Sequence, residues 1–213
     1  MTPSRLLDFG DDNLDRMNAG LVYDPTDDSL MDDQAAALEV LYDFNATRPS
    51  QIAERQELLA RMFASVGTGC YIEPPLHANW AGRHVTLGDN VYANFNLTLV
   101  DDVAITIGSN VMIAPNVVIA TAGHPILPEL RREAAQFNLP VVIGDNVWIG
   151  AGALIMPGIT IGDDTVIGAG SVVTRDIPAG VIAVGSPCRV VREIGDHDRE
   201  FYWRDRRIDF PLD

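Results

Sequence analysis

The chain has 213 residues, the length of one compact domain with at most an appended piece. Apolar residues make up 47% of the sequence and charged residues 21%, which is the balance of a globular protein with enough apolar material for a core. All 15 basic residues are Arg, and 30 acidic residues bring the formal net charge to −15, so nucleic acids and anionic membrane surfaces would be repelled and are excluded as expected partners.

Cysteine usage and hydropathy predict a cytoplasmic protein. Cys70 and Cys188 are too few for a disulfide scaffold, so we expect reduced thiols. The first residues contain no apolar run of the kind found in secretory signals. No stretch of 18 apolar residues occurs, so no membrane-spanning helix is expected.

Residues 1–69 are predicted to form an N-terminal helical segment. Up to Pro49, apolar residues recur at three- and four-residue steps, the spacing of one helix face. Pro49 ends this pattern because the residue before a proline is pushed out of the helical region. A second stripe runs from Ile52 to Val66, and Gly67 then stands where a helix C-cap is expected. Two helices joined at a proline turn predict an antiparallel hairpin.

Residues 70–188 repeat with a period of six. In the longest run an aliphatic or small residue returns at every sixth position, usually followed by Gly: Ile143, Ile149, Ile155, Ile161, Ile167, Val173 and Ala179. Earlier blocks begin at Leu87, Ile107, Ile113 and Ile119. Neither a helix nor a flat strand has this period, whereas a coil of short parallel strands has it, with three blocks in each turn. We expect the aliphatic column inside the coil, and Gly, Asn or Asp at turns that require positive φ.

Two segments depart from this repeat. Residues 125–140 follow His124 without any six-residue register and contain three prolines, which predicts a shaped loop protruding from the coil. Long loops in compact domains are usually functional. Residues 189–213 form a tail in which Arg alternates with aromatic and acidic residues. Because the acids cancel its charge, we expect this tail to pack on the coil or on a neighbouring subunit rather than on nucleic acid.

Several motifs resemble those of a known family. They are YANFNLTLVDD (Tyr92–Asp102), TAGHP (Thr121–Pro125), IGDNVWIGAGALIMPGITIG (143–162) and GSPCRVVRE (Gly185–Glu193). With them the chain resembles, from about Leu21 to about Arg207, the galactoside/maltose/nodulation sugar O-acetyltransferases of the hexapeptide-repeat acyltransferase superfamily. The resemblance implies a mainly β fold, a left-handed parallel β-helix with an N-terminal α-helical hairpin, assembled as a homotrimer with active sites between subunits. It also implies acetyl-CoA as co-substrate without a metal, and a small-molecule sugar or polyol as acceptor.

Acyl transfer to a hydroxyl needs a base, hydrogen-bond donors for the developing oxyanion, and a groove that orients both substrates. His is the natural base near neutral pH. By resemblance His124 matches the general base of the family, and the other three histidines are read as structural. The resemblance also implies that Asn94, Asp102 and Tyr92 bind the acceptor.

The resemblance places the acetyl-CoA site along the later blocks. Trp148 is too large for a narrow coil interior and should face outward, either as a wall for the pantetheine arm or as a subunit contact. The backbone N–H of Ala151 matches the family's donor to the thioester oxygen, and Ala169 is assigned to the same groove. The phosphates of coenzyme A need local positive charge. The remaining residues assigned to this site are Thr174, Arg175, Arg189 and Arg192, each with a solvated surface as the alternative reading.

The sequence departs from the family at three acceptor-side positions. Pro25 stands where an acidic residue is common, Gln34 where an Arg is common, and Trp80 where relatives have a small polar or acidic residue. These departures leave the reaction class intact and leave open which sugar or other acceptor is used. The predicted reaction is direct attack of the acceptor hydroxyl on the thioester, with no covalent enzyme intermediate, since no Ser or Cys stands beside His124.

Three alternatives stay open. A xenobiotic or other small-molecule acetyltransferase on the same scaffold would generally lack the helical hairpin together with NFNLTLVDD. A zinc-dependent carbonic anhydrase-like coil would need three converging His ligands, and His84 and His124 have no closely spaced partner. A non-enzymatic structural β-helix would show regular Thr ladders and no long loop.

Overall fold

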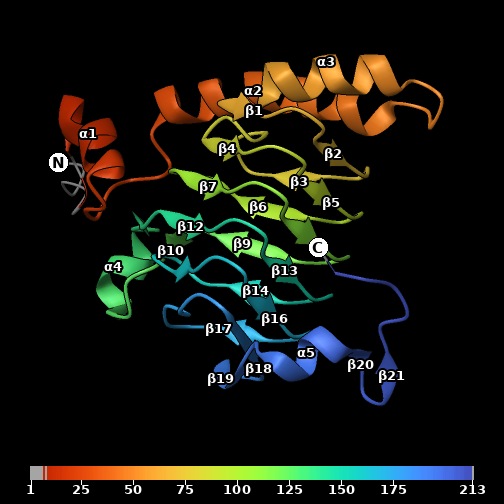
Figure 1. Cartoon of the computed structure of the whole chain (residues 1–213). Coiled ribbons are helices and arrows are strands. Elements are labelled where there is room, and N and C mark those ends of the chain that lie inside the picture. The colour runs from red at the N-terminus through yellow and green to blue at the C-terminus, as the bar shows by residue number, and fades with distance from the viewer. Residues whose placement is uncertain (1–6, 8, 213) are drawn as a thin grey trace, which may run out of the picture.

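The computed structural model describes Leu7 and residues 9–212, and Figure 1 shows a three-sided coil closed at one end by helices. The predicted parallel coil of hexapeptide repeats is confirmed, with about six turns. Among the described residues, no helix is long and apolar enough to cross a membrane. Cys70 and Cys188 are both buried free thiols.

Two long helices, α2 (Asp28–Ala46) and α3 (Ile52–Met62), form a cap over the first turn of the coil (Figure 1). Before them, η1 (Gly10–Asp12) and α1 (Asn13–Asn18) lie to the side of this cap, where α1 contacts β11 (Phe137–Asn138). The predicted pairing of two long helices agrees with the contacts between α2 and α3. Phe44 and Leu59, both fully buried, bring this hairpin into the same core as the coil. The cap therefore shares one hydrophobic core with the repeats that follow it.

The predicted end of the second helix is wrong. Phe63 already has extended backbone angles, φ −85° and ψ 150°, and Val66 lies in the first strand of the coil. Gly67 is therefore no helix cap: a Cβ there would stand 2.3 Å from the carbonyl oxygen of Gly88 in the next turn. Ile52, expected on the buried stripe, is 55% exposed.

Three sheets make the sides of the coil. The first sheet contains β1 (Ser65–Val66), β4 (Val85–Leu87), β7 (Ile105–Ile107), β12 (Val141–Ile143) and β15 (Thr160–Ile161). The second contains β2 (Tyr71–Ile72), β5 (Tyr92–Ala93), β8 (Met112–Ile113), β13 (Trp148–Ile149), β16 (Val166–Ile167), β18 (Val181–Val184) and β19 (Arg189–Glu193). The third contains β3 (His77–Ala78), β6 (Thr98–Val100), β9 (Val118–Ala120), β14 (Leu154–Ile155) and β17 (Val172–Val173). All strand pairs in them are parallel except β18 with β19.

The aliphatic column points into the coil as predicted, with one exception. Every member from Ile143 to Val173 has no exposed surface. The last predicted member, Ala179, is exposed instead, and Ile177 takes the inward position, bridging to Ile161. The carboxylate of Asp176 accepts a hydrogen bond from the Thr160 N–H at 2.8 Å, so a side chain replaces the backbone pairing there. The final turn is thus shortened by two residues, and the inward column continues at Ala183, which is fully buried and pairs with Ile167.

The turns follow the residue types. Asn90, Asn110, Asn146 and Asp164 occupy one column of turns and all have φ between 55° and 58°. Asn and Asp tolerate this left-handed region better than other side chains. Gly108 in the same column has no room for a side chain, because a Cβ there would lie 2.7 Å from the carbonyl carbon of Gly144.

One vertex of the prism holds the insertions into the repeat. It joins the third sheet to the first, and we call residues 79–84, 101–104 and 121–140 the insertion vertex. Leu87 pairs with Ile107, 20 residues on, whereas Ile143 pairs with Ile161, 18 residues on. The two extra residues in that turn put the Leu87 block out of phase with the later blocks, whereas Ile107 lies 36 residues, or six whole blocks, before Ile143 and shares its phase.

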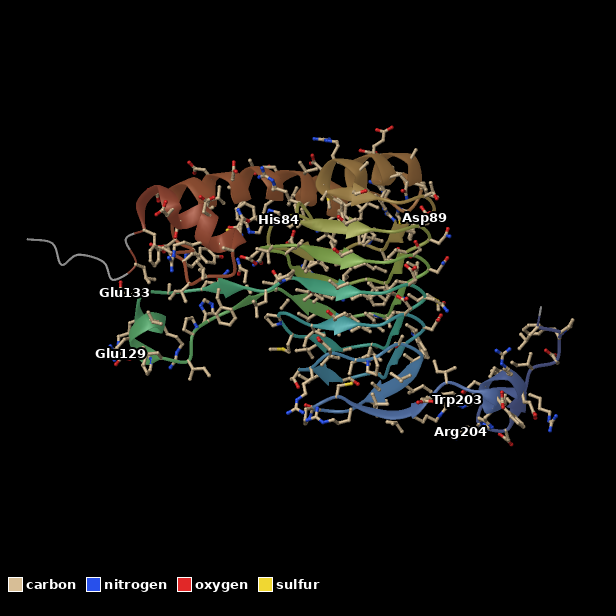
Figure 2. The ribbon with its side chains drawn as sticks, turned by 60° about the vertical axis from the view of Figure 1, so that its left-hand side comes forward. His84, Asp89, Glu129, Glu133, Trp203 and Arg204 are labelled. Atoms are coloured by element: carbon tan, nitrogen blue, oxygen red, sulfur yellow. The ribbon has the colours of Figure 1, made fainter. Side chains whose placement is uncertain are left out.

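The excursion predicted at 125–140 has its own short elements. They are α4 (Pro128–Arg132) and the antiparallel pair of β10 (Ala122–Gly123) with β11 (Phe137–Asn138). Figure 2 shows the excursion standing away from the coil, with Glu129 and Glu133 toward its outer end. At the other end of the coil the tail continues from β19 into α5 (Asp196–Glu200), β20 (Phe201–Trp203) and β21 (Arg206–Arg207). Trp203 and Arg204 lie in the part of the tail that reaches away from the coil (Figure 2).

Candidate active site

His124 follows β10 directly and opens the excursion. Its Nδ1 lies 2.8 Å from the carbonyl oxygen of Ala135, at the returning end of the same excursion. A carbonyl oxygen can only accept, so Nδ1 carries a proton, and in the neutral ring Nε2 keeps the free lone pair. The ring is exposed on the surface of the chain. His124 thus has the tautomer and the access that a general base needs.

Asp101 and Asp102 point to different surroundings, as neighbours on an extended chain should. Asp101 is fully buried and accepts hydrogen bonds of 2.8 Å from the N–H groups of Trp80 and Gly82. Burial raises the pKa of its carboxyl, an effect that these two bonds oppose. Its backbone carbonyl lies 2.6 Å from Nδ1 of His84. Asp101 and His84 therefore hold the insertion vertex together.

Asp102 belongs to a buried hydrogen-bond network. Its Oδ1 accepts from the amide of Gln136 at 3.0 Å, and its Oδ2 accepts from the amide of Asn79 at 3.1 Å. The Gln136 amide also lies 2.6 Å from the hydroxyl of Tyr23, and the Asn138 amide donates to that hydroxyl at 3.1 Å. Two of these residues come from the excursion and one from the N-terminal segment, so the network ties both to the coil.

A pocket of about 210 Å³ opens beside Asp102. Its lining comes from the N-terminal segment, α2, the insertion vertex and the excursion: Met17, Tyr23, Pro25, Leu30, Met31, Gln34, Asn79, Trp80, Asp102 and Gln136. All three departures from the family pattern, Pro25, Gln34 and Trp80, lie in this wall. The indole N–H of Trp80 is buried without a hydrogen-bond partner among the described residues.

Tyr92 and Asn94 lie at another vertex of the same chain. Tyr92 is on the outer face of β5 in the second sheet, 39% exposed, and Asn94 begins the turn toward the third sheet. The Asn94 side chain accepts the N–H of Phe95 at 2.9 Å. One chain alone therefore does not bring these two predicted acceptor residues to Asp102 and His124.

The outer face of the second sheet carries Trp148. It is 48% exposed and pairs in register with Met112 on one side and Val166 on the other. The side chain faces outward, as its size requires. Met112, Trp148 and Val166 thus form an apolar strip, which we call the Trp148 strip, beside the turn that contains Ala151.

Ala151 and Ala169 stand in equivalent turns, two residues after the paired positions Ile149 and Ile167. The backbone N–H of each makes no hydrogen bond to any described residue. In the preceding turns the Phe95 N–H is taken by Asn94 and Pro115 has no N–H at all. In this column of turns, among the described residues, Ala151 and Ala169 can therefore donate outward.

The polar residues predicted to bind coenzyme A lie at the C-terminal end of the coil. Thr174 and Arg175 are exposed in the turn after β17, and Arg189 is exposed on β19. Arg192 is already paired: its guanidinium makes two 2.6 Å hydrogen bonds to the carboxylate of Asp198. This pair holds the pKa of Asp198 well below its ordinary value.

Two other cavities in the described part of the chain contain none of the predicted site residues. One of about 460 Å³ lies between α2 and α3 and is lined by acidic and polar side chains with Arg61. Another of about 420 Å³ is lined by His84 and Leu139 among others. In the described part of the chain, no three His, Cys, Asp or Glu side chains gather as a metal site would require.

Sequence reasoning missed Tyr23, Asn79, Gln136 and Asn138 as site residues. A signal existed only for the two excursion residues, because long loops often carry function. Tyr23 lies two residues before Pro25, but nothing in the pattern connects it to Gln136, 113 positions away.

Comparison with known proteins identifies the family. Residues 16–67 match the family described as maltose acetyltransferase hexapeptide capping motif, and residues 140–175 match bacterial transferase hexapeptide (six repeats). The chain is 45% identical over 195 residues to a galactoside O-acetyltransferase of Escherichia coli (strain K12), which covers 92% of this chain and 96% of the relative. This chain belongs to the galactoside/maltose/nodulation sugar O-acetyltransferase family. It is also 44% identical over 176 residues to nodulation protein L of Rhizobium meliloti (strain 1021), across 83% of this chain and 96% of that protein.

Solved structures agree with this membership. A galactoside acetyltransferase in complex with coenzyme A superposes with a TM-score of 0.90 at 44% identity, covering 93% of this chain and 98% of that one. A maltose O-acetyltransferase from Clostridium difficile 630 gives a TM-score of 0.84 at 42% identity, covering 86% and 98%. The family member described here is therefore an acyltransferase with the hexapeptide-repeat fold.

Proposed function

We propose that this acyltransferase transfers the acetyl group of acetyl-CoA to a hydroxyl of a sugar or a sugar-like polyol, with His124 as general base. The observation that carries the proposal is the hydrogen bond from His124 Nδ1 to the Ala135 carbonyl, which makes Nε2 the basic nitrogen of the neutral ring on an exposed residue. The acetyl donor follows from relatives whose structures hold coenzyme A or acetyl-CoA. The acceptor class follows from relatives named for galactosides and maltose.

In the proposed reaction the acceptor hydroxyl attacks the thioester carbonyl carbon while His124 Nε2 takes its proton. The carbonyl oxygen becomes an oxyanion, which the outward N–H of Ala151 stabilises. When the tetrahedral intermediate collapses, the carbon–sulfur bond breaks and the imidazolium returns the proton to the leaving thiolate. The products are an acetyl ester and coenzyme A, with the base regenerated and no covalent enzyme intermediate.

Coenzyme A would lie along the apolar strip of Trp148, with its phosphates toward the C-terminal end of the coil. Thr174, Arg175 and Arg189 are exposed there, and Ala169 offers a further N–H. Because Arg192 is paired with Asp198, it would contact a phosphate only by exchanging that carboxylate. In a chain with net charge −15, this group of Arg residues provides a local attraction for an anion.

We further propose a homotrimer with its active sites between subunits. His124 and Asp102 lie at the insertion vertex of one chain, whereas Asn94 and the Trp148 strip lie at another vertex. A second copy could supply the missing half of each site, and the exposed Tyr92, Met112 and Trp148 would then be covered. The buried free thiols fit a reducing compartment such as the cytoplasm.

A thiol-release assay with acetyl-CoA and a panel of galactosides, glucosides, maltose and chitin-like sugars tests this function. We expect release with at least one sugar, and a roughly 10²–10⁴-fold lower turnover for His124→Ala, with acetyl-CoA affinity nearly unchanged. His77→Ala, an exposed His on β3, is the matched control and should keep wild-type turnover. Wild-type turnover in His124→Ala would remove His124 as the base.

A further inference from the structure

Tyr23 is held rigidly beside the Asp102 pocket. The residue is 1% exposed and lines the pocket with Asp102 and Gln136. Its backbone N–H donates to the carbonyl of Gln136 at 2.9 Å, and the Gln136 N–H donates back at 3.2 Å. This pair of bonds fixes the phenol relative to the excursion that also carries His124.

The donors and acceptors around the phenol can be assigned without ambiguity. An ionised carboxylate only accepts, so the Gln136 atom 3.0 Å from Asp102 must be its amide nitrogen. That nitrogen also lies 3.1 Å from the side chain of Asn138, which must therefore present its oxygen to Gln136. The amide nitrogen of Asn138 is then the atom that faces the Tyr23 hydroxyl.

The phenol oxygen consequently faces two amide nitrogens, that of Gln136 at 2.6 Å and that of Asn138 at 3.1 Å. The Gln136 nitrogen shares its two protons among Tyr23, Asp102 and Asn138, and neither amide nitrogen can accept the proton of the phenol. Among the described residues, no acceptor for the Tyr23 proton is present. A buried hydroxyl that cannot place its proton is disfavoured unless a ligand or water receives it.

The proton also stays on the oxygen at any ordinary pH. Burial raises the pKa of the Tyr23 phenol to about 12, and the charge of Asp102 acts in the same direction. The buried indole N–H of Trp80 in the same wall likewise has no partner among the described residues. Two donors without acceptors in one pocket favour a ligand rich in oxygen atoms.

We infer that Tyr23 is an acceptor-binding residue, whose phenolic O–H donates a hydrogen bond to an oxygen of the acetyl acceptor held beside Asp102. This inference rests on the proposed function. Because two amide nitrogens face its oxygen and its own proton has no acceptor, the phenol is left to donate, so it selects an oxygen with a free lone pair, such as a second hydroxyl or a ring oxygen. An ammonium group at that position would be rejected, since it has no lone pair to offer.

The test uses the full-length enzyme, acetyl-CoA, the best methyl glycoside of the panel and the monodeoxy derivatives of that glycoside. Tyr23→Phe should raise the acceptor KM about three- to tenfold, the equivalent of one neutral hydrogen bond, and leave the acetyl-CoA KM unchanged. If the partner oxygen is a hydroxyl, the monodeoxy glycoside that lacks it should have a higher KM than the parent glycoside with the wild type. Tyr23→Phe should then raise the KM of that monodeoxy glycoside no further. If it is the ring oxygen, the corresponding carbocyclic glycoside should behave in this way.

Tyr42→Phe is the control. Tyr42 is 75% exposed on α2 and is not among the residues that line the Asp102 pocket. The change should leave the acceptor KM unchanged. The analogue series on the wild type alone keeps the test valid if Tyr23→Phe does not fold.

The outcomes separate the two claims. If the wild type releases no thiol with any sugar, the proposed function fails and this inference with it. If the wild type is active but no analogue cancels the effect of Tyr23→Phe, or Tyr23→Phe has the wild-type acceptor KM, the inference alone is overturned.

Discussion

His124 and His84 make the same kind of hydrogen bond in different surroundings. Each ring presents Nδ1 to a backbone carbonyl, at 2.8 Å from Ala135 and at 2.6 Å from Asp101. The His84 ring packs 5.4 Å from the ring of Trp80, centroid to centroid, within the insertion vertex. The His124 ring is exposed at the root of the excursion, where a second molecule can reach it. Both rings carry a proton on Nδ1, so the tautomer does not distinguish them. Access of a substrate to the ring favours His124 over His84 as the base.

The pKa of Tyr23 gives a prediction for alkaline pH. The folded-state pKa of about 12 lies above the ordinary value of 10.0, so folding favours the protonated phenol. The stability that this difference contributes is complete below pH 10 and is lost as the pH rises toward 12. In ultraviolet titration, the difference between wild type and Tyr23→Phe should show one phenol ionising near pH 12. A midpoint near 10 would contradict the buried network.

The sequence pointed to some of the residues that line the Asp102 pocket but not to others. Pro25, Gln34 and Trp80 stood out because they depart from a resembled pattern. Tyr23 and Gln136 did not, because their chemistry depends on a contact between positions 113 apart. Such a contact exists only after the excursion has folded back onto the N-terminal segment.

At the scale of elements, the inward column holds the coil together. Ile149 has no exposed surface and pairs in register with Ile113 and Ile167. Ile149→Ala removes methyl groups from a core that cannot close the gap, so it should lower the free energy of unfolding by about 2–5 kcal/mol.

Urea unfolding at fixed protein concentration measures this change, since assembly would otherwise shift the midpoint. Thr160→Ala, an exposed position on β15, is the control and should change the free energy of unfolding by no more than about 0.5 kcal/mol. Equal effects of the two substitutions would show that the column does not carry the stability of the coil.

The period of six predicted the coil and its inward face because every turn buries the same kind of side chain at the same position. The ends of the elements were not predicted, because apolar spacing alone does not show where one element gives way to the next. Val66 continues the apolar stripe of the helix yet lies in the first strand, because the same apolar side chain fits either core. Ala179 keeps the period, but Asp176 has already replaced the strand pairing with a side-chain bond.

At the scale of the whole molecule, the predicted site residues divide between two vertices. His124, Asp102 and the Tyr23 pocket are at the insertion vertex, and Asn94 is at the turn between the second and third sheets. The sequence placed them in one site only through resemblance to a family of trimers. A single chain cannot show such a site from its own pattern, because the pattern specifies packing within the coil and not between copies.

Mixing two inactive variants tests the central claim most directly. If each site takes its base from one copy and Asn94 from the next, each mixed trimer of His124→Ala and Asn94→Ala contains one intact site. Refolding an equal mixture should then restore roughly a quarter of wild-type thiol release, by the statistics of a closed three-membered ring. Activity no higher than the average of the two separate variants would contradict a site shared between subunits.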